Sequence, residues 1–352
     1  MSTVVEPPSA RPEERPATAR TGSLLRAELH RFRARRFVQV IFGLAVLGAL
    51  VETVVGLTSF GMPTEAELAA AQAEIDRMVV ENEQFRRDCL ANPPTDLPPD
   101  ITVEEACGPP VTTADFDLGM FLSDPPFSLA QDAVPGVLGS AVAGAALAFL
   151  LGATWIGAEW STRSLVSLLF WEPRRVRVMA VKLAVLVLGA LVLAVGLQAA
   201  WLATVVVLDA TAGDGRGVPD GFWGQLFGTQ ARGVLLTVLA AIGGFGLTSL
   251  VRNTGAALGI GFVYFAVVEI AAAVLRPAWQ PWLLTSSAAG LLSPGGHIVF
   301  IFEETIDPAT GSIVGETREV LVSNLQGGLV LGAVAVAAVV LGVVLFARRD
   351  VH

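Results

Sequence analysis

The sequence predicts an all-α integral membrane protein with six transmembrane helices, and two observations support this. The chain has 352 residues, of which 53% are hydrophobic and 16% charged, and its mean hydropathy is +0.63. Soluble domains usually carry about 25% charged residues. Several uncharged windows also exceed the roughly 20 residues that a helix needs to cross a bilayer. These windows are apolar on every face, whereas the strands of a membrane barrel would alternate polar and apolar residues.

The apolar windows place the six spans and define the segments around them. The spans are expected at 37–60, 133–157, 178–208, 230–251, 254–275 and 322–347. Residues 1–21 are rich in Pro, Arg, Glu, Ala and Thr and are expected to form a disordered cytoplasmic tail. Residues 22–36 are expected to form an amphipathic interfacial helix, because Leu25, Leu29 and Phe32 share one helical face. The alternative is a positively charged anchor for the first span.

A seventh apolar window, Pro277–Phe302, is expected not to span. It carries no charge, but three prolines and a Gly-Gly pair divide it into pieces too short to cross a bilayer. Trp279 and Trp282 suit a membrane interface. Residues 276–321 are therefore expected to be an extracytoplasmic re-entrant or loop region with short helices in the outer leaflet.

The placement of arginine predicts the orientation. With six spans, 16 of the 23 basic residues and seven acidic residues fall on the inner side, against seven basic and 23 acidic residues on the outer side. A multi-pass protein of the bacterial cell (plasma) membrane is expected, with both termini in the cytoplasm. The net charge of −9 comes from the outer loops and argues against nucleic acid as a partner.

Residues 61–132 form the largest expected outer segment, an extracytoplasmic helical loop domain. Thr64 and Glu67 have the spacing of a capping box at the start of a helix. Cys89 and Cys107 both lie in this loop, on the side of the membrane where disulfides persist. A disulfide between them is expected, with free thiols as the alternative. The loop contains no histidine, which disfavours a metal site.

The cytoplasmic segment 158–177 concentrates charge between the second and third spans. Glu159 ends the second span, a short capped helix is expected over "STRSLVSLLF", and Pro173 stops that helix. A capped amphipathic helix of this size can dock into a groove on another protein. The alternative is a positively charged retention loop, which explains the arginines but not the order of the residues.

The sequence "EWSTRSLVSLLFWEPRR" followed by a basic re-entry into the membrane resembles the membrane subunits of ABC-2 type ABC transporters. The basic N-terminal helix, the six spans and the short outer helices before the last span resemble that family from about residue 22 to the end. The ratio of 22 arginines to one lysine suggests a GC-rich genome, as in an actinobacterial-like member. The long acidic loop after the first span departs from the simplest members.

The resemblance implies a permease subunit, expected to be an exporter, whose segment 158–177 is the coupling helix loop. Its partners would be a cytoplasmic ABC ATPase subunit, a second permease subunit in a homodimer or heterodimer, and membrane lipid. The residues expected to dock the ATPase are Glu159, Arg163, Ser164, Leu165, Leu168, Pro173, Arg174 and Arg175.

The chain itself is not expected to be an enzyme or to hold a cofactor or a metal. The sequence has no G-x-x-x-x-G-K-[ST] phosphate loop, because its one lysine, Lys182, follows Val181. ATP-Mg would therefore be bound by the partner subunit. The alternative function is a membrane receptor or scaffold protein with a ligand-binding extracytoplasmic loop.

Three polar residues within the spans are expected to line a transport pathway. Glu52, Gln198 and Glu269 lie in the outer halves of the first, third and fifth spans. A charged side chain at mid-helix costs about 2.5–3.5 kcal/mol on insertion scales, so such residues usually face a cavity or a partner. The alternative is that they are wetted near the outer interface or pair locally.

Overall fold

The computed structural model describes residues 21–94, 101–162, 164, 170, 174–306 and 313–348. The chain forms two compact units. The first comprises Met1–Gly43, Ala143–Ala194 and Val234–His352, and the second comprises Leu44–Val142 and Val195–Gly233.

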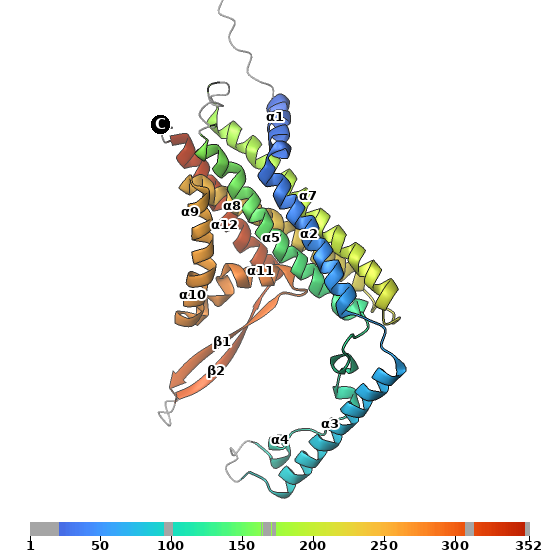
Figure 1. The fold of residues 1–352 in the computed structure, drawn as a ribbon. Coiled ribbons are helices and arrows are strands. Elements are labelled where there is room, and N and C mark those ends of the chain that lie inside the picture. Colours follow the sequence, from blue (N-terminus) through green and yellow to red (C-terminus); the bar gives the residue numbers. More distant parts are fainter. Residues whose placement is uncertain are drawn as a thin grey trace, which may run out of the picture. The chain divides into compact units, whose positions relative to one another are not determined.

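Six segments of the described chain are helical, long and apolar enough to cross a membrane (Figure 1), which confirms the predicted number of spans. They are α2 (Arg36–Ser59), α5 (Leu129–Ser161), α7 (Arg175–Ala212), α8 (Phe222–Val251), the segment Thr254–Leu275 and α12 (Asn324–Arg348). Segment Thr254–Leu275 consists of α9 (Thr254–Val263), the π-helical turn η3 (Tyr264–Val268) and α10 (Glu269–Leu275).

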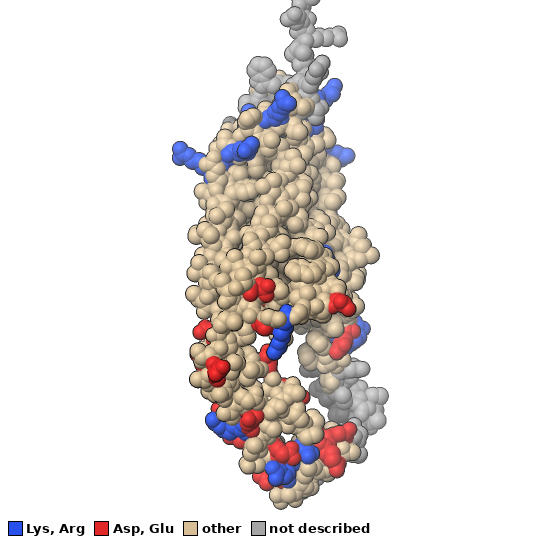
Figure 2. All heavy atoms as spheres, turned by 90° about the vertical axis from the view of Figure 1, so that its right-hand side faces the viewer, with Lys and Arg blue, Asp and Glu red and all other residues tan. Residues whose placement is uncertain are grey.

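The surface charge is consistent with these helices lying in a bilayer. On the face drawn in Figure 2, a wide middle zone is almost free of charged side chains. Large apolar side chains are exposed along the helices, for example Val46 at 62% and Val192 at 65%. Lipid would cover such side chains.

The basic N-terminal segment forms helix α1 (Thr21–Ala34), which is separated from α2 only by Arg35. Its buried face carries Leu24, Glu28 and Phe32, whereas Leu29 is 37% exposed. Of the three residues of the predicted apolar face, only Phe32 is buried within the protein. Apolar periodicity missed the buried face because its middle residue, Glu28, is charged.

The loop after α2 contains α3 (Glu65–Ala91), α4 (Val103–Ala106) and the 3₁₀ turns η1 (Thr113–Asp115) and η2 (Leu118–Phe121). The predicted capping box begins α3, with Glu67 Oε2 accepting from the Thr64 amide at 2.7 Å. The hydrogen bonds from Thr64 hold the pKa of Glu67 below its usual range. A disulfide joins Cys89 to Cys107, whose Cα atoms are 5.7 Å apart.

The region before α12 differs from the prediction, because much of it is an antiparallel hairpin. After η4 (Pro277–Trp282) and α11 (Leu284–Leu292), strand β1 (His297–Ile306) pairs with β2 (Ile313–Val322). Short helices are thus present as η4 and α11, as expected, whereas the two strands that follow depart from the all-α expectation. Val299 and Ile301 are buried while Ile298 and Phe300 are exposed, which is the period-two alternation of a strand.

The turn into the hairpin and the start of α12 are fixed by specific residues. Gly295 and Gly296 have φ of 81° and 106°, a backbone conformation that favours glycine. The Asn324 side-chain amide donates to the carbonyls of Gly290, Leu291 and Ser293 at 2.8–3.0 Å. It therefore satisfies the last carbonyls of α11 while opening α12.

Candidate functional site at the connector between α5 and α7

Four charged side chains form a buried network where α1, α5 and α7 meet. Lys182 Nζ donates to Glu28 Oε2 at 2.7 Å and lies 3.3 Å from Glu159 Oε2. Arg35 donates through Nη2 to Glu159 Oε1 and through Nη1 to the Trp155 carbonyl oxygen at 2.8 Å. Glu28, Arg35, Glu159 and Lys182, here called the charge network, thus balance two carboxylates with two cations.

The charge network lies inside the protein. Lys182 is 0% exposed, and Glu28 and Glu159 are each 1% exposed. A buried ion pair adds little net stability compared with apolar packing, but removal of one member leaves an uncompensated charge. The network therefore fixes the position of α1 against α5 and α7 more than it adds to their overall stability.

Trp155 forms the aromatic wall of the network. Its ring makes an edge contact with Phe32 at 5.1 Å between centroids. The Arg35 guanidinium lies 4.5 Å from the ring centroid and Lys182 Nζ lies 5.3 Å from it, both within cation–π range. The indole Nε1 donates to the Lys182 carbonyl oxygen at 3.2 Å. Trp155 on α5 thereby contacts Phe32, Arg35 and Lys182.

The network extends to the start of the connector, residues 162–174, which links α5 to α7. Ser164 Oγ donates to Glu159 Oε2 at 2.8 Å. Of the residues expected to dock an ATPase, Glu159 is instead taken up inside the chain and Arg174 is exposed. Arg163, Leu165, Leu168 and Pro173 lie outside the described residues, so the expected coupling helix stays a prediction.

A second set of contacts lies at the same helix ends. The Trp160 ring meets the Phe346 ring edge-on at 5.6 Å. Arg252 lies 4.8 Å from the Trp160 ring centroid, and Arg175 lies 5.8 Å from that of Phe346. Arg175 Nη1 also donates to the Phe346 carbonyl oxygen at 3.1 Å. Arg175, another predicted docking residue, thus ties the start of α7 to the end of α12.

Sequence reasoning missed three members of the charge network: Glu28, Arg35 and Lys182. Two signals pointed to them. Glu28 is the only acid in the basic segment 22–36, and Lys182 is the only lysine of the chain. Lys182 also lies within a long apolar run, where a charge is expected to need a partner. The partner itself could not be identified, because 154 positions separate Lys182 from Glu28.

The structure places Glu52 and Gln198 in one polar layer of the second unit. Ser140 Oγ on α5 lies 3.2 and 3.3 Å from the two carboxylate oxygens of Glu52 on α2. The next residue of α2, Thr53, has its hydroxyl oxygen 2.6 Å from that of Thr204 on α7. These contacts join three helices that run side by side in Figure 1.

Gln198 brings α8 into the same layer. Gln230 Nε2 donates to the Gln198 carbonyl oxygen at 3.1 Å. A Cβ atom added to Gly233 would lie 2.9 Å from the Ala141 side chain and 3.0 Å from Gln198 Nε2. Glycine is therefore needed there for the close approach of α8. Glu52, Ser140, Gln198, Gln230 and Gly233 are here called the polar layer.

Contacts on either side set the depth of Gln198 within the helices. Just before α5, the backbone of Phe127 forms hydrogen bonds with Ala212 and Asp214 at the end of α7. Further into both helices, Trp201 Nε1 donates to the Ala133 carbonyl oxygen. The two helices are therefore antiparallel. Ser140 lies about one turn beyond Gly136, which packs against the Trp201 ring. Gln198 lies about one turn before Trp201, so Ser140 and Gln198 are at one level.

Glu269, the third residue expected in a pathway, has a structural partner in the first unit. Its carboxylate accepts from the Thr285 amide at 3.0 Å and from the Thr285 hydroxyl. A carboxylate bound to the first turn of α11 satisfies an otherwise orphaned amide. This contact corresponds to the local-pairing alternative for Glu269.

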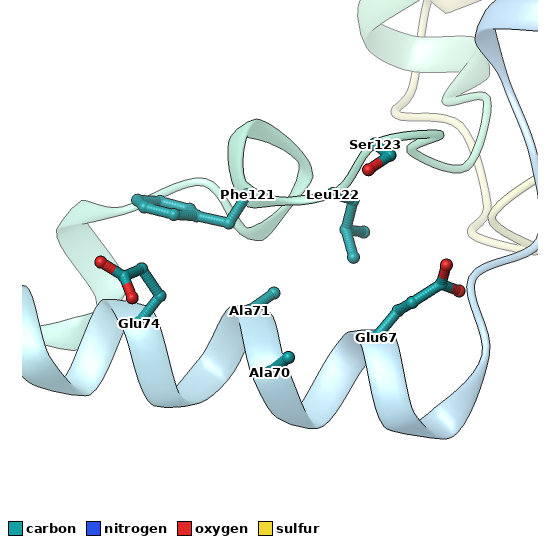
Figure 3. Close-up of a pocket in the computed structure, with 7 residues that line it drawn as sticks. All are labelled: Glu67, Ala70, Ala71, Glu74, Phe121, Leu122 and Ser123. Carbon is teal, nitrogen blue, oxygen red and sulfur yellow. The ribbon is translucent and has the colours of Figure 1, made fainter.

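The acidic loop contains a cleft of about 270 Å³ between α3 and η2 (Figure 3). Ala70, Ala71 and Leu122 line its middle, and the carboxylates of Glu67 and Glu74 lie at its two ends. Both are engaged, Glu67 by Thr64 and Glu74 by Arg77 at 2.9 Å. Within the described residues, no group of three or more His, Cys, Asp or Glu side chains could hold a metal ion.

Comparisons with protein-family models, with curated proteins and with solved structures find no match to this chain. The residues and their geometry therefore carry the functional argument.

Proposed function

We propose that the chain is the membrane-spanning permease subunit of an ABC-2 type transporter. In this proposal a separate cytoplasmic ATPase docks on the connector, and ATP hydrolysis there drives movement of the spans and export of a cargo. Two such permease subunits would work with two ATPases. The termini and the connector would face the cytoplasm, as the arginine distribution predicts.

The observation that carries the proposal is that both ends of the connector are anchored to the spanning helices. Glu159 and Ser164 hold its entry, and Lys182 on α7 holds the helix that leaves it, through the same network. Trp160 and Arg175 provide a second anchorage through Phe346. Movement of either end of the connector would therefore be transmitted directly to α1, α5, α7 and α12.

The connector also has the chemistry of a docking segment. Arg174 is exposed, and the sequence of residues 161–173 has the apolar and polar pattern on which the resemblance rests. Exposed arginines can set the register of an interface through complementary charge. A receptor or scaffold protein would not require such a doubly anchored connector.

The test is gentle purification of the native assembly, followed by mass spectrometry and an ATPase assay. An ATP-hydrolysing subunit should copurify with the wild-type chain, and Arg174→Glu should weaken that association and uncouple hydrolysis from transport. Arg348→Glu reverses another exposed arginine, at the end of α12, and should have no such effect. An assembly without any ATPase, or full coupling in Arg174→Glu, would contradict the proposal.

A further inference from the structure

The polar layer has more hydrogen-bond acceptors than donors. Ser140 has one hydroxyl hydrogen, and the Gly136 carbonyl oxygen, at 2.8 Å, is closer to Ser140 Oγ than either oxygen of Glu52. The Gln198 side chain is 5% exposed, and its Oε1 is buried without a donor among the described residues. Buried polar atoms are nearly always bonded, so an unpaired Oε1 points to a missing donor.

No cation among the described residues pairs with Glu52. Arg232 is the basic residue of α8 next to Gly233; its Nη2 donates to Thr229 Oγ1 at 2.8 Å, and its Nε is buried without an acceptor among the described residues. No ion pair joins it to Glu52 in the described structure. Glu52 therefore lies in a spanning helix with a hydroxyl as its partner, in contrast to each carboxylate of the charge network.

We propose that the polar layer binds the ammonium group of a cationic amphiphile, with Glu52 compensating the charge and Gln198 Oε1 accepting an N–H. This inference rests on the proposed function, since it names the class of cargo. A primary ammonium offers three N–H donors and one positive charge, which matches the deficit. A neutral alcohol would leave the charge unpaired, and a hard divalent cation would require about six oxygen ligands.

The surroundings of Glu52 favour an amphiphile over a small ion. Its neighbours Val51, Val54 and Val55 are 52%, 58% and 53% exposed on α2, so this side of the helix would face lipid acyl chains. Glu52 itself is half-buried, between that surface and Ser140. An apolar tail could remain in the bilayer while the head group reaches the carboxylate, as in the snorkelling of long basic side chains.

The test is a binding titration on the full chain in lipid nanodiscs. Dodecylammonium is compared with dodecyltrimethylammonium, which has the same charge and tail but no N–H donor. The wild-type chain should bind dodecylammonium about tenfold or more tightly than Gln198→Leu or Glu52→Gln does, because a hydrogen bond to a charged group is lost. Binding of the trimethyl compound should be weaker and unchanged by Gln198→Leu.

Matched controls make both outcomes decisive. Gln225→Leu makes the same change at an exposed glutamine in the first turn of α8 and should bind like the wild type. Circular dichroism reports whether each variant is folded. If Gln198→Leu does not fold, the nearly isosteric Glu52→Gln alone tests the proposal. Equal affinities of wild type and folded variants, or of the two amphiphiles, would overturn the proposal.

The result is separable from the proposed function. Binding to the isolated chain requires no ATPase, so selective binding would stand even if no ATPase copurified. Conversely, copurification of an ATPase without selective binding would contradict only the proposed class of cargo and not the proposed function.

Discussion

The charge network and the polar layer both place ionisable side chains among apolar helices, but they differ in how completely those side chains are paired. In the network each carboxylate contacts two cations, because Glu28 pairs with Lys182 and with Arg31 of α1, and Glu159 pairs with Lys182 and Arg35. In the polar layer Glu52 contacts only a hydroxyl, and Gln198 Oε1 has no donor in the described structure. A cluster whose polar groups are all paired can hold helices in place, whereas a cluster with unpaired acceptors can still bind a ligand.

The difference also separates two tasks that the proposed function needs. A connector that transmits force should be joined rigidly to its spans, and the network is at the connector. A cargo site should bind and release, so its groups should not be fully satisfied by the protein itself. The unpaired acceptors are accordingly found in the other unit of the chain, among α2, α5, α7 and α8.

The largest effect is expected from breaking the charge network at its centre. Lys182→Met leaves Glu159 with only Arg35, and Glu28 with only the half-exposed Arg31 at 3.3 Å, so the free energy of unfolding should fall by about 3–5 kcal/mol. Thermal unfolding in detergent, followed by circular dichroism, measures the change. Arg26→Met removes an exposed basic residue of α1 and should have little effect.

A second substitution tests whether uncompensated charge is the cause. Glu28→Leu, added to Lys182→Met, removes the buried carboxylate that has lost Lys182, and should recover part of the lost stability. If Lys182→Met is as stable as Arg26→Met, the network does not hold these helices together.

An intermediate effect is expected from separating α5 and α7 beside the polar layer. A Cβ atom on Gly136 would overlap the Trp201 ring, so Gly136→Ala should lower the free energy of unfolding by about 1–3 kcal/mol through overpacking. It should also disturb the bond from Trp201 Nε1 to the Ala133 carbonyl, and therefore shift the total tryptophan emission of the protein. Gly139→Ala is the matched control, because nothing lies within 4 Å of its added Cβ. Identical spectra and stabilities for the two variants would contradict this packing.

The two regions also differ in what the sequence could predict. The six spans and the capping box of α3 depend on local composition and spacing, so both could be read from the chain. The pairing of Lys182 with Glu28 depends on contacts across 154 positions, which no local pattern encodes. The burial of Glu28 on α1 could not be predicted for the same reason, since its buried partner Lys182 lies on α7.

The hairpin before α12 was missed for a different reason. The first six residues of its first strand lie in an apolar run that has no charge, and a short apolar run does not distinguish a strand from a buried helix. The alternation of Val299 and Ile301 with Ile298 and Phe300 becomes visible only once burial is known. For the pathway residues, the sequence identified Glu52 and Gln198 as unusual, but only the structure separates them from Glu269, which is bonded to α11.

The smallest effect, close to zero or slightly stabilising, is expected for Gln198→Leu in the absence of ligand. Replacement of a paired buried polar group leaves its partner unsatisfied, whereas replacement of an unpaired one removes a desolvation penalty. Gln198 Oε1 is of the second kind, while the bond from Gln230 uses the Gln198 backbone carbonyl, which leucine retains. Thermal unfolding should therefore place Gln198→Leu at or above the wild type and far above Lys182→Met. A loss of stability comparable to that of Lys182→Met would mean that the Gln198 amide is part of a saturated cluster, and the distinction between the two regions would fail.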